Sequence, residues 1–595
     1  MVFFIAITPI SALTIAPVDV RVMDIKSLTR AMEIGLITSE QLVNIYLERI
    51  EKYNEEFNAI NFINENAVKE ARELDRKRRE GNIKGLLHGI PIIVKANIDV
   101  VGLPTTAGAR ALEENMPKRD AEVVKRLRDA GAIIIASANM SEFGFSARDS
   151  RSSYGSVRNA WNHLYTPYGS SGGSSVSVAL SFAAASLGTD TNSSIRIPVS
   201  AAYLVGFRPT FDLLSMRGII PYDTTRDVVG PITKTVSDSA ILMSVMGDID
   251  YTRNISENGL EGKVIGVATE LHIGNNNALV VHNLRTYGPI IDLMSEKIEK
   301  MENAGATIVN IDRVITPHYF GIARNTMAGF TMCDGFTEYI KGTTGPIRSF
   351  RDLVNAPGKT QSLREHLNGC NQPVRNSLRN RRAEYERHIT TIFEDNNLDA
   401  LIYPTTKNKL MLLNSTDNTL NSPGTNLPSV IGFPSVSMPL GFDSDNLPYG
   451  IEFLGRKGSE DILFQIISGY EALFNEIKVT PLAPSLYEIP ESVTILVENY
   501  KRILEIERPN RTTKNLIKDI KEYFANYESN ENREIDAERL NNRYDRLNSN
   551  DWFYFLSRIT RIIFITIISF RIFVKVVRFM VKRKRKIKRK KSKRS

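Results

Sequence analysis

The feature that most constrains this chain is the stretch Tyr168–Pro198, where two turns rich in serine and glycine flank a segment of small apolar residues. The first turn lies at Gly169–Ser177 and the second at Gly188–Ser194. Glycine and serine favour tight turns in which backbone N–H groups converge on one point. Such a cradle suits an anion, or an oxyanion that develops during a reaction. The stretch therefore predicts a binding or catalytic centre around which the remaining chain folds.

Helices and strands alternate on both sides of this stretch. His88–Lys95 is an apolar, β-branched run that predicts a buried strand ending in a lysine. Residues 121–130 predict an amphipathic helix, Gly131 its end, and Ala132–Ala136 a second short strand. Earlier in the chain, Thr38–Gln41 has the pattern of a capping box before a helix. This alternation is typical of an α/β fold.

The formal net charge of +9 is a property of the C-terminal end of the chain and not of its body. Residues 571–595 contain 14 Lys or Arg and no Asp or Glu, so 9 − 14 leaves −5 for residues 1–570. A body with this charge does not predict a nucleic-acid surface. The seven histidines and two cysteines form no metal-ligand motif, so we expect no catalytic metal and no cofactor.

The last segment, 551–595, combines an apolar run with a basic face. Its uninterrupted apolar run, Ile562–Phe570, is shorter than the roughly 20 residues that span a bilayer. On a helix, one arc of about 100° would hold Arg561, Arg571, Lys575, Arg578 and Lys582. This pattern predicts a tail that associates with an anionic membrane surface. The alternatives are a single C-terminal transmembrane anchor, a disordered tail, a nuclear-import sequence and a non-specific RNA-binding arm.

Several functions are compatible with one serine-rich turn. Gly169–Gly173 matches the G-x-S-x-G nucleophile elbow, but that motif follows a strand, and Tyr165–Tyr168 reads as a turn. A phosphate-binding loop would need G-K-[ST], or G-x-G-x-x-G after a strand, and neither is present. A purely structural loop is the default for a single turn. Two such turns, with a lysine upstream that is costly to bury, favour a functional site.

Three motifs together resemble the amidase signature family. That family has a strand ending in G-x-P-x-x-V-K, then G-G-S-S-G-G-S, then G-T-D-x-G-G-S-I-R-x-P. Here residues 89–95 read G-I-P-I-I-V-K, residues 168–174 read Y-G-S-S-G-G-S, and residues 188–198 read G-T-D-T-N-S-S-I-R-I-P. The resemblance covers about residues 24–490. It implies a mixed, mostly parallel central sheet with helices on both faces, followed by an α-helical C-terminal appendage.

The resemblance also implies a Ser–Ser–Lys triad. Ser194 would be the nucleophile, Ser170 the bridging serine, held in the family by a cis peptide, and Lys95 the base. Serine is a poor nucleophile until a base removes its proton. A lysine at the end of an apolar strand loses solvation, which lowers its pKa towards neutrality and lets it act as that base. Asp190 and Arg196 are expected to fix the second turn as an ion pair and to take no part in the chemistry.

The loop before the nucleophile departs from the family pattern. Backbone N–H groups of Thr191, Asn192 and Ser193 would form the oxyanion hole and contact the substrate. The family has Gly-Gly where this chain has Asn192-Ser193, and glycine is the residue that adopts a positive φ without strain. We therefore expect a reshaped loop and an altered choice of substrate. Asn192–Ser194 also matches a glycosylation sequon, but a buried turn excludes a glycan.

Four regions are expected along the chain. The first 18 residues are apolar and as long as a signal peptide, but they lack its positive start, so we favour a packed N-terminal arm over secretion. The expected regions are an N-terminal arm (1–23), the amidase domain (24–490), a charged helical appendage (491–550) and the membrane-associating tail (551–595).

The predicted function is hydrolysis of the C–N bond of a linear carboxamide through an acyl-serine. One alternative is the glutaminase subunit of a tRNA-dependent amidotransferase, ranked second because Asn325–Gly335 lacks the R-x-D-G-V-R-Y-G pattern associated with it. The other is a catalytically silent, membrane-attached amidase-like protein. We expect a small amide as substrate, a membrane-associated location and no specific nucleic-acid partner, and a homodimer stays open.

Overall fold

The computed structural model describes residues 17–269, 280–314, 331–357, 376–407, 409–415, 424–474, 477–486, 489–506, 511–525 and 534–546. The chain divides into two compact units, the larger containing Asp19–Tyr487 and the smaller Glu488–Ser595. Most of the expected N-terminal arm and the whole tail 551–595 lie outside the described residues, as do residues 325–330.

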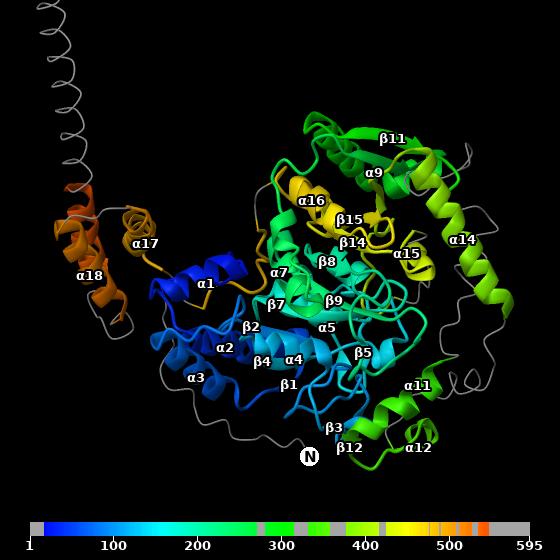
Figure 1. The fold of residues 1–595 in the computed structure, drawn as a ribbon, viewed down its shortest axis with the longest axis horizontal. Helices are drawn as coiled ribbons and strands as arrows, with labels where there is room; N and C mark the ends of the chain where they lie inside the picture. The colour runs from blue at the N-terminus through cyan, green and yellow to red at the C-terminus, as the bar shows by residue number, and fades with distance from the viewer. Residues whose placement is uncertain are drawn as a thin grey trace, which may run out of the picture. The chain divides into compact units, whose positions relative to one another are not determined.

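The larger unit is built on a mixed sheet of eleven strands in its described part (Figure 1). In sheet order the strands are β1 (Ile60–Ile63), β4 (Ile133–Ala138), β2 (Pro91–Lys95), β7 (Ala185–Asp190), β9 (Val228–Thr233), β8 (Val205–Arg208), β14 (Ser435–Phe442), β15 (Pro448–Gly455), β13 (Ala400–Pro404), β10 (Val264–Ala268) and β11 (Thr307–Ile311). β4, β2 and β7 run parallel, as do β13, β10 and β11, whereas the strands between β7 and β13 pair antiparallel. The predicted α/β class with a mixed central sheet is confirmed.

Helices cover both faces of this sheet. On one face, α5 (Gly172–Ala179) and α6 (Arg196–Ser200) pack against Ile232 of β9. On the other face, Phe207 of β8 stacks on Phe464 of α16 (Glu460–Glu471), beside α7 (Val236–Gly247) and α4 (Glu122–Asp129). Ile232 and Phe207 point to opposite faces because Ile232 pairs with Gly206, the residue before Phe207.

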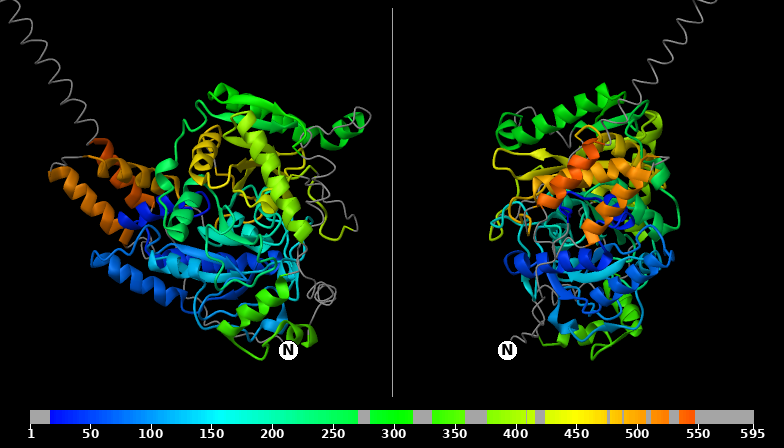
Figure 2. Two further views of the ribbon diagram at one scale, coloured as in Figure 1. Left: turned by 45° about the vertical axis from the view of Figure 1, so that its right-hand side comes forward. Right: turned by 90° about the vertical axis from the view of Figure 1, so that its left-hand side faces the viewer.

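The remaining helices lie towards the ends of the sheet. α2 (Ser39–Phe57) and α3 (Ala67–Arg79) pack together near β4, and α9 (Val280–Asn303) packs near β11 and β14, at the far end of the unit (Figure 2). The others are α1 (Ile25–Glu33), α11 (Met332–Tyr339), α12 (Phe350–Asn355), α14 (Asn376–Asp395) and α15 (Asn426–Ile431). Two short antiparallel ribbons complete the unit: β3 (Met116–Pro117) with β12 (Thr343–Thr344), and β5 (Arg151–Ser152) with β6 (Gly155–Ser156).

Local sequence signals explain where several of these elements begin and end. The predicted capping box is confirmed, since Thr38 Oγ1 accepts from Gln41 N at 3.1 Å and Thr38 N donates to Gln41 Oε1 at 2.9 Å. Gly131 follows α4 with a φ of +96°, and a Cβ there would lie 2.6 Å from His88 Cα. A side chain is excluded at this turn, and β4 starts directly after it.

The smaller unit is helical where it is described. It contains α17 (Glu491–Leu504), α18 (Arg511–Ala525) and a helix at 534–546. Tyr500 packs on Phe524, and Asn499 Nδ2 donates to Asn541 Oδ1 at 3.0 Å. Among the described residues of both units, no helix combines the length and the hydropathy that a membrane span requires.

Candidate active site

Lys95 ends β2 at the edge of the sheet where the neighbouring parallel strand β7 also ends. Its side chain is fully buried, and Nζ donates to Ser170 Oγ at 2.7 Å and to Thr189 Oγ1 at 2.9 Å. A third contact, to the carbonyl oxygen of Thr189, measures 3.3 Å. Parallel neighbours end at the same edge of a sheet, so the topology itself brings Lys95 to the second serine-rich turn.

The pKa of Lys95 is about 7, well below its ordinary value of 10.5, because burial removes the water that would solvate an ammonium ion. The negative charges of Asp190 and Asp227 oppose this effect only in part. At neutral pH a large fraction of Lys95 is therefore the free amine. That is the form able to accept a proton.

The first turn presents Ser170 directly to Lys95. The Gly169–Ser170 peptide is cis, and Ser170 is 2% exposed. Backbone atoms approach the turn closely: a Cβ on Gly169 would lie 2.2 Å from Asp149 O, and one on Gly173 would lie 2.1 Å from Asn139 O. Only glycine fits at these two positions, which explains why the turn is so rich in it.

The second turn is held by a buried cluster of charges. Asp190 accepts from Arg196 Nε at 3.1 Å and from Arg208 Nη1 at 3.0 Å, and Arg196 also pairs with Glu452. Burial would raise the pKa of Asp190, but the two arginines outweigh it and keep the pKa at about 2. We call Asp190, Arg196, Arg208 and Glu452 the paired cluster. The expected Asp190–Arg196 ion pair is one part of it.

Asn192 and Ser193 lie in this turn without the left-handed backbone expected there, since neither has a positive φ. The Asn192 carbonyl oxygen accepts from Arg196 Nη2 and from Ser429 Oγ, both at 2.6 Å. These two donors hold the carbonyl in place with an ordinary φ, so the strain argument was wrong. The Asn192 side chain adds a contact that glycine could not make, accepting from Arg226 Nη1 at 2.8 Å.

Ser194 lies on the same turn, just before α6, and is 7% exposed. Its carbonyl oxygen accepts from Ser171 N at 3.2 Å, which joins the two turns next to Ser170. Beside them lies a small cavity, lined by Ser170 and Thr191 and by the apolar residues Phe143 and Ile220. The structure thus joins Lys95 to Ser170 directly and places Ser194 on the adjoining turn. This arrangement can support nucleophilic attack by a serine on a carbonyl group.

The larger unit is similar to proteins of one family. A family model described as amidase matches residues 41–464. The chain belongs to the amidase family. The resemblance seen in the motifs is thereby confirmed, and the protein is a hydrolase that acts on amides.

Individual relatives of the enzyme span nearly its whole larger unit. It is 31% identical to a probable amidase of Arabidopsis thaliana over 474 residues, 73% of this chain and 86% of that protein. It is 30% identical over 480 residues to a glutamyl-tRNA(Gln) amidotransferase subunit of Trichodesmium erythraeum, covering 75% and 96%. The solved peptide amidase of Stenotrophomonas maltophilia superposes with a TM-score of 0.69 at 29% identity, covering 78% and 99%. These proteins differ in activity, so the substrate must be argued from the enzyme's own site.

Sequence reasoning missed several residues of the site. Thr189 lay inside the last of the three motifs but was given no role, and no role was predicted for Glu452. Asp227 lay in none of them, although Thr191 Oγ1 donates to its Oδ1 at 2.6 Å. The register of β7 and β9 explains its position, because Val228 pairs with Asp190 and so brings Asp227 beside Thr191. Only the strand pairing, which no local pattern reveals, could have found it.

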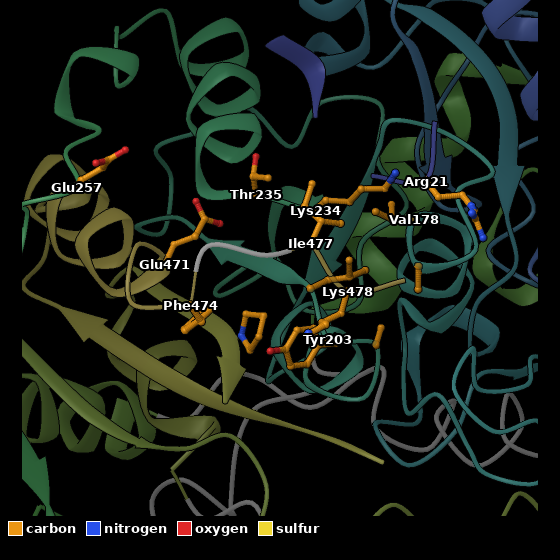
Figure 3. Close-up of a pocket in the computed structure, with 14 residues that line it drawn as sticks. Arg21, Val178, Tyr203, Lys234, Thr235, Glu257, Glu471, Phe474, Ile477 and Lys478 are labelled. Atoms are coloured by element: carbon orange, nitrogen blue, oxygen red, sulfur yellow. The ribbon is translucent and has the colours of Figure 1, made fainter. Parts of the chain in front are cut away.

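A second cavity is lined by none of Lys95, Ser170 and Ser194 (Figure 3). Lys234 Nζ donates there to Val20 O at 2.8 Å, and Glu471 Oε1 accepts from Val236 N at 2.8 Å. Burial lowers the pKa of Lys234 to about 7 and raises that of Glu471 to about 7. Lys234 binds the backbone carbonyl of Val20, and Glu471 accepts from the first N–H group of α7. Both groups therefore have a structural role.

Proposed function

We propose that the enzyme hydrolyses the C–N bond of a linear carboxamide through an acyl-serine intermediate, with Ser194 as nucleophile, Ser170 as proton relay and Lys95 as base. The observation that carries the proposal is the 2.7 Å hydrogen bond between the buried Lys95 Nζ and Ser170 Oγ, next to the turn of Ser194. Family membership supplies the reaction class.

The proposed reaction follows from these positions. Lys95, as the free amine, accepts the proton of Ser170 Oγ, and Ser170 in turn accepts the proton of Ser194 as its oxygen attacks the amide carbonyl. Backbone N–H groups of Thr191, Asn192 and Ser193 stabilise the oxyanion, each well-placed donor contributing about 3 kcal/mol. The relay returns the proton to the leaving amine as the C–N bond breaks. Water then attacks the acyl carbonyl and loses a proton to the same relay. The relay returns that proton to Ser194 Oγ as the ester bond breaks and the carboxylic acid leaves.

The test replaces Ser194 with alanine and measures hydrolysis of simple amides. Ser194→Ala is expected to abolish turnover and labelling by a fluorophosphonate probe, with an unchanged circular dichroism spectrum. Ser177→Ala is the matched control, because Ser177 lies in α5 with its hydroxyl on Gly173 O, away from the relay. Full activity in Ser194→Ala would refute the triad, and it would not touch the family assignment.

The cavity beside Ser170 supports an apolar group on the substrate. Phe143 and Ile220 line it together with Tyr222, and Phe145 packs edge-on against Tyr222 at 5.5 Å between ring centroids. The rest of the lining includes polar residues, Asp227 among them. The apolar wall favours an apolar group because burial removes the surface of that group from water. A panel of short, aromatic and long-chain amides should show kcat/KM rising with the apolar area of the substrate. A preference for small polar amides would contradict this part of the proposal.

A second candidate is the glutaminase subunit of a tRNA-dependent amidotransferase. It is supported by the 30% identity to the amidotransferase subunit of Trichodesmium erythraeum. Incubation with glutamine, alone and with the partner subunits of such an enzyme, separates the two functions. Glutamine hydrolysis that depends on the partners would favour the second candidate.

Membrane association through residues 551–595 stays a prediction. Its support is the apolar and basic pattern of that segment alone. Deletion of residues 552–595 should release the enzyme from vesicles that contain anionic lipid. The expected regions of the chain and a homodimer also stay predictions, and light scattering of the full chain would test the latter.

A further inference from the structure

Asp227 connects the nucleophile loop to the wall of the cavity. Thr191 Oγ1 donates to Oδ1 at 2.6 Å, while Oδ2 accepts from Tyr222 N at 2.7 Å and from Asp223 N at 2.8 Å. The carboxyl group is almost completely buried, with 6% of the residue exposed. One side chain therefore fixes the position of Thr191, three residues before Ser194, relative to Tyr222.

The same side chain lies where two cavities meet. Asp227 and Met216 line both the small cavity beside Ser170 and a larger, open cleft. The cleft also contains Asp99, whose carboxylate accepts from Tyr339 Oη at 2.6 Å. The position of Asp227 makes it a neighbour of the reacting groups and not only a support for a distant loop.

The carboxylates around the site differ in how their charges are balanced. Asp190 and Glu452 belong to the paired cluster, and Asp223 pairs with Arg226 at 3.0 Å. In the part of the chain that the structure describes, Asp227 is held by hydrogen bonds and forms an ion pair with no Lys or Arg. Asp190 acts more strongly on Lys95 than Asp227 does, but its two arginines keep its charge constant.

We propose that Asp227 is a positioning residue of the amidase site: through Thr191 it fixes the loop that carries Ser194, and its negative charge stabilises the ammonium form of Lys95. The inference rests on the proposed triad. It assigns Asp227 no proton transfer, because its hydrogen bonds are made to Thr191 and to backbone N–H groups.

The sign of the electrostatic effect follows from the neighbours of the two groups. Lys95 donates to Ser170 and Thr189, and the charges of Asp190 and Asp227 act on it. Burial raises the pKa of Asp227 to about 7, against the hydrogen bond from Thr191, and the charge of Asp223 adds to the rise. A negative Asp227 favours a protonated Lys95, so removing the charge lowers the pKa of Lys95. Because both groups titrate near pH 7, their titrations are coupled.

Tyr222 and Arg226 complete the surroundings of Asp227. Burial raises the pKa of Tyr222 to about 12, so its phenol stays neutral over the relevant range. Arg226 stays positive there, paired with Asp223. Neither group changes charge between pH 5 and 9. The pH profile over this range therefore reports the protonation of Lys95 and Asp227.

The experiment follows the rate of Ser194 phosphonylation by a fluorophosphonate probe, and of anilide hydrolysis, from pH 5 to 9. Asp227→Asn keeps both backbone hydrogen bonds but removes the charge. It should move the rising limb of both profiles to lower pH by roughly one unit. Thr191→Val keeps the charge and removes the hydrogen bond. It should lower kcat roughly 3- to 10-fold without moving the limb, and Thr191→Ser should restore the rate.

Asp99→Asn is the control for charge in the cleft, since Asp99 is not among the groups that act on Lys95. It should leave the limb in place. An unmoved limb in Asp227→Asn, or an equal shift in Asp99→Asn, would overturn the electrostatic role. An undiminished rate in Thr191→Val would overturn the positioning role, whether or not Asp227→Asn folds. If the probe does not label Ser194 in the wild-type enzyme, the proposed function falls first and this inference falls with it.

Discussion

Two charged side chains end the neighbouring strands β2 and β7, and both are fully buried, yet they behave in opposite ways. Asp190 faces two arginines, which keep its pKa at about 2. Among the described residues Lys95 donates to neutral oxygens alone, and its pKa lies at about 7. Equal burial thus gives one group of constant charge and one that titrates near neutrality. The opposite charges nearby, more than the degree of burial, therefore decide which buried group keeps its charge and which can exchange a proton near neutral pH.

The largest effect on stability should come from breaking the paired cluster. Arg196→Met leaves Glu452 with uncompensated charge in the interior and Asp190 with Arg208 as its remaining arginine, which should destabilise the larger unit by about 3–5 kcal/mol. Thermal denaturation followed by circular dichroism measures the effect. Lys125→Ala is the control, because its pair with Asp129 is exposed and should change stability by less than about 0.5 kcal/mol. Equal shifts of the melting temperature in the two variants would contradict the predicted difference between buried and exposed ion pairs.

Lys95→Met should differ from Arg196→Met, because the enzyme should lose its activity and keep its stability. Removing the proposed base should lower kcat by about 10²- to 10⁴-fold. The wild-type enzyme has a folded pKa of about 7 for Lys95 against 10.5 unfolded, so the unfolded state binds more protons between these values and stability rises with pH there. The advantage of Lys95→Met in melting temperature should therefore be greatest below pH 7 and fade towards pH 10.5. A variant less stable than wild type at every pH would contradict the account of Lys95 as an unbalanced charge.

The wild-type pH profile tests the same contrast without substitution. kcat/KM should rise about tenfold per pH unit below pH 7, as Lys95 loses its proton, and level off above it. Asp190 should leave no trace in the profile between pH 5 and 9, because its pKa lies at about 2. Steady-state kinetics with a neutral anilide supply the measurement. A rate independent of pH over this range would exclude Lys95 as the base.

The sequence predicted Lys95 and its strand better than it predicted the buried charges around Asp190. The strand ending in Lys95 and the capping box at Thr38 follow local rules of hydrophobicity and hydrogen bonding, and both were confirmed. Arg208, Glu452 and Asp227 reach the site through pairings between strands that are distant in sequence. No local pattern encodes those pairings. Partner choice for buried charges therefore had to come from the structure.

The backbone of the nucleophile loop shows the same limit at a single position. Asn192 was expected to reshape the turn because the family has glycine there. In the structure its carbonyl is held by Arg196 and Ser429, and its side chain by Arg226. Contacts from α6, α15 and the residues before β9 decide its conformation. The rule about glycine was sound, but it did not apply to this φ.

The smallest effect should come from Asn192→Gly, which restores the family residue. The substitution removes the hydrogen bond from Arg226 and leaves the carbonyl contacts intact. One net hydrogen bond contributes about 0.5–1.5 kcal/mol, so kcat/KM should change by about 2- to 10-fold, with the pH profile unmoved. Asn192→Asp is the informative companion, because it keeps an acceptor for Arg226 while adding a negative charge to the loop. If Asn192→Gly lost as much activity as Lys95→Met, the side chain of Asn192 would belong to the reacting groups and not to the scaffold that surrounds them.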